Sequence, residues 1–166
     1  MARGQPSPPA PLADASPFRF AVIVSRFHDT ITGRLRDGAL AALTEAGAAQ
    51  VQVFDVPGAF EIPQAARAAA ETGRFDAVIC LGCVIRGETP HFDYISSAVA
   101  HGIMTAAGDA GVPMAFGVLT TDTVAQADAR SGPGADNKGR EAAAAAIEMA
   151  ALYQRIDVDA ARTSEA

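Results

Sequence analysis

Four short runs of apolar and β-branched residues alternate along the chain with segments of helical periodicity. The runs lie at residues 18–25, 51–56, 75–85 and 112–119. Each is almost continuously apolar, which is typical of strands that are buried on both faces of a parallel sheet. Because parallel strands need long crossovers, the alternation predicts an α/β fold, a three-layer sandwich with a four-stranded parallel sheet and helices on both faces.

The segments between and after these runs are predicted to be helices. They cover residues 31–46, a short segment that begins near Pro63, and residues 90–110, 123–129 and 138–156. Gly47 follows the first of them directly, as glycine commonly does at the C-terminus of a helix. Proline suits the first turn of a helix, which favours a helix start near Pro63.

The 166 residues are enough for one domain of ordinary size, which we place at residues 18–156. Five of the ten prolines fall within residues 1–17. This segment is therefore expected to form a disordered tail. Residues 157–166 are polar and small, and are expected to form a second tail.

The charge and the cysteine content argue against several classes of protein. The net charge is −6, and Lys138 is the single lysine, so neither a nucleic-acid surface nor a polybasic membrane patch is indicated. No run reaches the ~18 apolar residues of a membrane helix. Cys80 and Cys83 are too few for a disulfide scaffold, and inside a strand they point to opposite faces, which favours core packing. We expect a cytoplasmic protein.

Ligands of parallel sheets bind beyond the carboxyl ends of the strands, which makes the loop at residues 86–91 a candidate site. We expect Thr89 to cap the next helix and Pro90 to occupy its first position, so that free N–H groups form an anion site. His91 lies in the first turn, where the helix dipole favours a neutral imidazole that both accepts and donates protons. An exposed histidine that only forms hydrogen bonds is the alternative, and position alone leaves both open.

Two other segments suit ligands but have ordinary explanations as well. Phe60 and Glu61 lie in a proline-rich loop and suit a flat heterocycle, but taken alone the loop favours the ordinary explanation, in which Phe60 packs inward and Glu61 is placed by a helix dipole. Arg130 and Lys138 flank a glycine–proline loop and suit a phosphate, although solvated surface charges are commoner. No nucleotide-binding glycine motif follows a strand.

Several motifs become recognisable when they are taken together. They are SRF at 25–27, VPGAFEIP at 56–63, LGCVIRG at 81–87, HFDY at 91–94, FGVLTT at 116–121 and NKG at 137–139. In order and spacing, over about residues 18–156, the chain resembles the 6,7-dimethyl-8-ribityllumazine synthases. The resemblance implies a flavodoxin-like sheet with strand order 2-1-3-4. It also implies a transferase that condenses 5-amino-6-(D-ribitylamino)uracil with 3,4-dihydroxy-2-butanone 4-phosphate, in riboflavin biosynthesis, without a metal or organic cofactor.

The resemblance also implies roles for individual residues. His91 would transfer protons as the catalytic residue. The implied substrate-binding residues are Phe27, Ala59, Phe60, Glu61, Cys83, Val84, Ile85, Glu88, Thr89, Phe116, Arg130 and Lys138. Phe27 would stack on the pyrimidine, Phe116 would reach it from an adjacent subunit, and Arg130 would bind the phosphate. A catalytically weak family member that binds riboflavin or lumazine is the alternative function.

The resemblance further implies self-association as a homopentamer or a multiple of it, and it does not decide whether pentamers assemble into an icosahedral shell. Riboflavin synthase is a candidate partner. Two features depart from the usual pattern. His28 stands where the family often has asparagine, and whether its imidazole takes part in the site is left open by the sequence. Residues 132–136 read GPGAD, which lacks the lysine that the family has in this segment.

Overall fold

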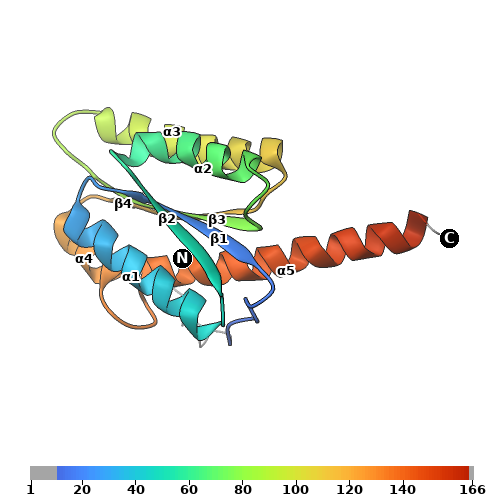
Figure 1. Ribbon diagram of the computed structural model, residues 1–166. Coiled ribbons are helices and arrows are strands. Elements are labelled where there is room, and N and C mark those ends of the chain that lie inside the picture. The colour runs from blue at the N-terminus through green and yellow to red at the C-terminus, as the bar shows by residue number, and fades with distance from the viewer. Residues whose placement is uncertain (1–10, 165–166) are drawn as a thin grey trace, which may run out of the picture.

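The computed structural model describes residues 11–164, and the remainder of both predicted tails, residues 1–10 and 165–166, lies outside this range. Figure 1 shows one sheet between two layers of helices. The elements, in chain order, are β1 (Arg19–Ser25), α1 (Asp29–Glu45), β2 (Gln50–Val56), the 3₁₀ turn η1 (Ala59–Glu61), α2 (Ile62–Glu71), β3 (Ala77–Ile85), α3 (His91–Ala110), β4 (Met114–Thr121), α4 (Val124–Ser131) and α5 (Lys138–Ser164). The predicted three-layer α/β sandwich is confirmed.

The sheet is wholly parallel and has the order β2-β1-β3-β4, as the resemblance implied. Val22 in β1 pairs with Val53 of β2 on one side and with Ile79 of β3 on the other. Central β3 is buried over its first seven residues, whereas the edge strand β2 is mostly exposed. The expectation of burial on both faces therefore holds for the central strands and fails at this edge.

Each face of the sheet packs against its own helices. Figure 1 shows α2 and α3 on one face and α1, α4 and α5 on the other. Because successive side chains of a strand point to opposite faces, Cys80 belongs to the core under α2 and α3. Cys83 belongs to the core on the other face. Both are free thiols, and the prediction that they pack in the core without pairing is confirmed.

The start of α5 is held against α1 by a close backbone approach. Gly139 has no Cβ, and an added one would overlap the carbonyl oxygen of Leu35 in α1. Gly38 likewise leaves room for the side chain of Asn137. Small residues on both helices therefore fix where α5 begins. They thereby also set the position of Lys138, the first residue of α5.

Both ends of the described chain differ from the sequence expectations. Ala15 is fully buried, and its N–H donates to the carbonyl of Ala46 at 2.8 Å, so residues 11–17 lie against the domain. Helix α5 continues to Ser164 instead of ending at Ile156, and it projects beyond the sheet (Figure 1). Despite its length, neither α5 nor any other helix of residues 11–164 is long and apolar enough to cross a bilayer.

Candidate active site

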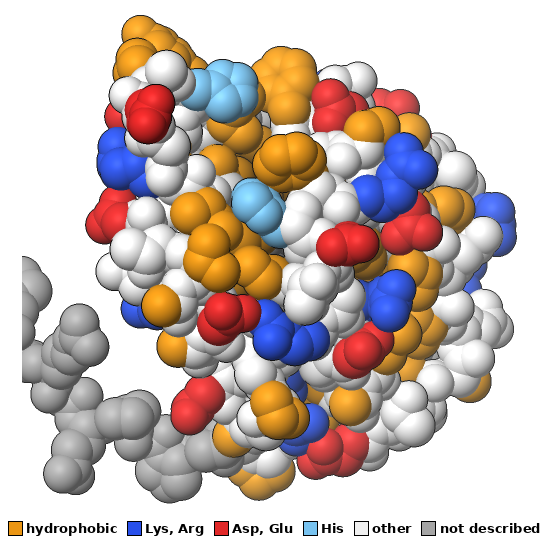
Figure 2. Space-filling model, turned by 90° about the vertical axis from the view of Figure 1, so that its left-hand side faces the viewer, with side chains coloured by type: hydrophobic (Ala, Val, Ile, Leu, Met, Phe, Trp, Pro, Cys, Tyr) orange, Lys and Arg blue, Asp and Glu red, His pale blue; other side chains and the backbone are white. Residues whose placement is uncertain are grey.

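A hollow of about 320 Å³ lies at the carboxyl ends of β1 and β3, beside η1 and the start of α3. We call it the histidine pocket. Its walls are formed by Phe27, His28, Gly58, Ala59, Phe60, Cys83, Val84, Ile85, Gly87, Thr89, His91, Phe92 and Ile95. Figure 2 looks onto this end of the molecule, where histidine and hydrophobic side chains lie next to one another. The location is the one expected for ligands of parallel sheets.

The turn η1 contributes one buried and one exposed wall residue. Ala59 is buried, whereas the ring of Phe60 remains 53% exposed. The alternative that Phe60 packs inward is therefore wrong, and its ring is accessible to a ligand. Glu61 is half-buried and does not line the pocket in the single chain. Its carboxylate lies beside Gly58, where an added Cβ would stand 3.1 Å from Oε2.

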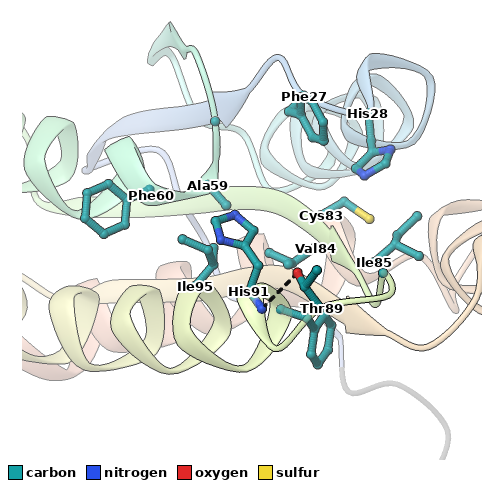
Figure 3. A pocket seen from close by; sticks show the side chains of 13 residues that line it. Phe27, His28, Ala59, Phe60, Cys83, Val84, Ile85, Thr89, His91 and Ile95 are labelled. Atoms are coloured by element: carbon teal, nitrogen blue, oxygen red, sulfur yellow. Dashed lines mark hydrogen bonds between the residues drawn. The ribbon is translucent and has the colours of Figure 1, made fainter.

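His91 is the first residue of α3, and its ring points from the helix toward Ala59 (Figure 3). Its backbone N–H donates to Oγ1 of Thr89 at 3.5 Å, which is a long hydrogen bond. Pro90 occupies the cap position, and its carbonyl accepts the N–H of Asp93 at 3.0 Å. The prediction of Thr89 as the cap residue was therefore wrong by one position. The exposed ring of His91 is free to meet a ligand.

Cys83 is a neutral wall of the pocket and not a nucleophile. Only 2% of its surface is exposed. Burial, and secondarily the negative charge of Asp128, raises the pKa of the Cys83 thiol from 9.0 to about 11. The reactive form of a cysteine is the thiolate, which is scarce at neutral pH with such a pKa.

Arg86 holds the loop before α3 to two other segments. Its guanidinium donates to Asp122 at 2.8 Å and to Asp93 at 3.2 Å, and it lies 4.3 Å from the ring centroid of Phe92. Its backbone N–H donates to the carbonyl of Thr121 at 2.9 Å. The hydrogen bonds to the two carboxylates raise the pKa of Arg86 above its already high value. Arg86 thereby joins the wall of the histidine pocket to the end of β4.

A second hollow of about 390 Å³ follows the edge strand β4 and the start of α5. We call it the basic pocket. Its walls are formed by residues 116–121 together with Arg130, Lys138, Glu141, Ala142 and Ala145. Arg130 donates to the carbonyl of Gln126 at 2.9 Å, and Lys138 lies 2.7 Å from Glu141. Phe116 stands in the same hollow with 48% of its surface exposed.

The two pockets have complementary chemistry. No lysine or arginine lines the histidine pocket, whereas the basic pocket contains Arg130 and Lys138 beside the exposed ring of Phe116. Within residues 11–164, no group of three or more histidine, cysteine, aspartate or glutamate side chains is arranged to hold a metal ion. A flat apolar ligand suits the first pocket, and an anion suits the second.

Comparison with known proteins identifies the family. The family model described as 6,7-dimethyl-8-ribityllumazine synthase matches residues 17–154. The chain belongs to this family. It is 56% identical over 144 residues to the 6,7-dimethyl-8-ribityllumazine synthase of Syntrophus aciditrophicus (strain SB), an alignment that covers 86% of this chain and 94% of that protein. It is 55% identical over 141 residues to the synthase of Salinibacter ruber (strain DSM 13855 / M31), which covers 84% and 90%.

The fold divides the residues implied by resemblance to lumazine synthases into three groups. The histidine pocket gathers Phe27, Ala59, Phe60, Cys83, Val84, Ile85, Thr89 and His91. The basic pocket gathers Phe116, Arg130 and Lys138. Glu61 and Glu88 line neither hollow of the single chain. The assignment of substrates to these residues stays a prediction.

Asn137 supports the basic pocket, a role that the lumazine synthase motif containing it does not imply. Its buried amide nitrogen donates to the carbonyls of Arg34, Ser131 and Gly132 at 3.1, 3.0 and 2.9 Å. Its amide oxygen accepts the N–H groups of Gly139 and Arg140 at 2.9 and 3.1 Å. The amide thus fixes the loop between α4 and α5. The sequence signal was an asparagine directly before a helix, which is a common cap position.

Proposed function

We propose that the chain condenses 5-amino-6-(D-ribitylamino)uracil with 3,4-dihydroxy-2-butanone 4-phosphate to give 6,7-dimethyl-8-ribityllumazine, phosphate and water. The enzyme is a transferase in the penultimate step of riboflavin biosynthesis. The observation that carries this proposal is the pairing of an apolar, aromatic pocket with a cationic one in a member of the family. One substrate is a flat ring, and the other carries a phosphate.

The uracil ring binds in the histidine pocket. The ring of Phe27 is 66% exposed and offers a face for stacking, and the exposed ring of Phe60 offers another apolar contact. Val84 and Ile85 end the central strand and offer backbone groups at the pocket wall. Ala59 and Glu61, on η1, hold the ribityl side of the substrate.

His91 transfers protons between the two substrates. The amine of the uracil attacks the carbonyl of the butanone phosphate, and loss of water gives an imine. Removal of a proton from the neighbouring carbon then drives out phosphate, and ring closure releases water. A positioned imidazole that accepts and returns these protons contributes ~10²–10⁴-fold in such reactions. Alignment of the two substrates contributes further, because it replaces a bimolecular encounter.

The phosphate binds between the start of α3 and the basic pocket of an adjacent copy. Backbone N–H groups near Glu88 and Thr89 precede a helix N-terminus, which attracts anions. Arg130 supplies a guanidinium for paired hydrogen bonds, and Lys138 adds a second positive charge nearby. The histidine pocket needs such a partner because its own walls contain no lysine or arginine.

The active site is therefore shared between copies, and we propose a homopentamer or a multiple of it. The basic pocket follows β4, which is an edge strand, and edge surfaces are open to association. A head-to-tail arrangement closes into a ring, in which each copy gives its histidine pocket to one site and its basic pocket to the next.

Turnover tests the proposed reaction directly. Purified protein given both substrates should form a product with the absorbance of a lumazine. A rate no higher than that of the uncatalysed reaction in buffer would refute the proposal. Tight binding of riboflavin or ribityllumazine without turnover would instead indicate a binding protein.

Mixing two impaired variants, assayed at a butanone phosphate concentration below the raised KM, tests the shared site. His91→Ala and Arg130→Ala lie in different pockets, so random mixing into rings regenerates complete sites at about one interface in four. We expect activity to return after the two variants are unfolded together and refolded. Activity no greater than the sum of the separate variants would show that both residues serve the same chain's site.

A further inference from the structure

His28 has a strained backbone that the first helix holds in place. With φ 60° and ψ 49°, it is the one non-glycine residue of positive φ within residues 11–164. Such strain is uncommon and clusters at functional sites. The His28 carbonyl accepts the N–H groups of Ile31 and Thr32 at 2.9 and 3.0 Å. The conformation is therefore fixed by the first hydrogen bonds of α1.

The side chain of His28 takes no part in capping that helix. His28 stands at the cap position of α1, yet its ring forms no cap hydrogen bond. A side chain at this position usually accepts an N–H of the first turn. The imidazole instead lines the histidine pocket, next to Phe27 (Figure 3). The left-handed backbone thus presents the ring to the pocket.

The imidazole and the ring of Phe27 are in direct contact. The two ring centroids are 4.7 Å apart, and the planes are inclined by 72°, which is a favourable edge-to-face geometry. Phe27 itself is 66% exposed, so it has little other packing to fix its orientation. Its backbone carbonyl accepts only a long hydrogen bond of 3.5 Å from Oγ of Ser25.

We propose that His28 is a positioning residue, which holds the Phe27 ring so that its face meets a flat heterocyclic ligand. The nature of that ligand rests on the proposed function. The edge-to-face contact restricts the rotation of Phe27 about its side-chain bonds before the ligand arrives. Less conformational freedom is then lost on binding, which strengthens binding of the heterocycle.

A double-mutant cycle tests whether His28 acts through Phe27. The variants are His28→Gly, Phe27→Ala and both together, and the readout is the Kd of 6,7-dimethyl-8-ribityllumazine from fluorescence titration. Glycine adopts positive φ readily, so His28→Gly removes the ring while the backbone is kept. We expect this change to weaken binding ~3–10-fold, the range of an aromatic pair contact. In the Phe27→Ala background the same change should have no further effect.

Two results would overturn the proposal: wild-type affinity in His28→Gly, or effects of the two substitutions that simply add. The melting temperature of His28→Gly should be no lower than that of the wild type, because glycine relieves the strain. This separates a binding defect from misfolding.

Two matched substitutions sharpen the test. Asparagine also tolerates positive φ but lacks the ring, so His28→Asn should bind as weakly as His28→Gly. Wild-type affinity in His28→Asn would show that a polar group, not the ring contact, is what matters. His101→Asn removes an exposed histidine that lies outside the histidine pocket, and should leave the Kd unchanged. Wild-type turnover is measured separately, so a failure of the proposed reaction is distinguishable from a failure of this inference.

Discussion

The histidine pocket and the basic pocket differ in what they offer a ligand. The first is lined by apolar and aromatic side chains with two histidines, and the second by a guanidinium, an ammonium paired with the carboxylate of Glu141, and an exposed phenylalanine. The first lies where the central strands end, and the second follows an edge strand. The difference indicates that recognition of a ring and of a phosphate is divided between two surfaces.

The pockets also differ in how they are held. A buried strand, β3, forms one wall of the histidine pocket, and Arg86 ties the loop before α3 to Asp93 and Asp122. The basic pocket depends on a loop between two helices, which the single amide of Asn137 fixes through five hydrogen bonds. Substitutions should therefore affect one pocket with little effect on the other.

The largest effect is expected from His91→Ala. Loss of the proton-transfer group should lower kcat by ~10²-fold or more, whereas the Kd of ribityllumazine should change little. Steady-state kinetics and fluorescence titration give the two values. His101→Ala, on the same helix but outside the pocket, is the control. A kcat within threefold of the wild type would remove His91 from the mechanism.

Arg130→Ala should act on the other substrate. Loss of a charge-assisted hydrogen bond should raise KM for the butanone phosphate ~10–100-fold, while KM for the uracil substrate stays nearly constant. Arg155, an exposed arginine of α5 that lines neither pocket, provides the control in Arg155→Ala. A selective rise in KM for the uracil substrate would contradict the division of the two pockets.

Asn137→Ala should weaken the basic pocket without a direct ligand contact. Three carbonyls and two N–H groups lose their partner, so we expect a lower melting temperature and an increase of roughly tenfold in KM for the butanone phosphate. The Kd of ribityllumazine should change much less.

Asn137→Asp keeps both acceptor bonds but places a carboxylate against three carbonyl oxygens. It should therefore destabilise the protein as well, which differential scanning calorimetry would detect. An equal loss of affinity in both pockets would show that Asn137 supports the whole fold and not the basic pocket alone.

The sequence predicted the layers and the central strands because burial on both faces leaves an uninterrupted apolar run, as in β3. It also placed His91 at the start of α3. The exact cap was missed because Thr89 and Pro90 both suit a helix start, and only backbone geometry separates them. The end of α5 was missed because residues 157–164 are exposed, so no hydrophobic pattern marks them as helical.

The supports of the two pockets were the hardest features to predict. Arg86 meets Asp122 across 36 residues, and Asn137 meets Arg34 across 103, so neither contact leaves a periodic pattern in the sequence. The strained backbone of His28 also leaves no pattern in the sequence, because φ is a property of the folded backbone. In the sequence, only the resemblance separates Phe116 and Arg130 from His91, whereas the structure places them in two different pockets.

The smallest effect is expected at Cys83, and it concerns stability more than catalysis. Because the thiol is neutral, Cys83→Ala should lower kcat by less than about threefold, whereas loss of a nucleophile would abolish turnover.

The raised pKa of the Cys83 thiol also has a consequence for stability. The unfolded thiol ionises near pH 9 and the folded one near pH 11, so the stability that the buried thiol contributes is complete below pH 9 and is lost as the pH rises toward 11. Chemical denaturation across this range should show a smaller decline in Cys83→Ala than in the wild type. Cys80, with its pKa raised to about 12, should continue to titrate in both proteins, and equal declines would mean that Cys83 does not contribute.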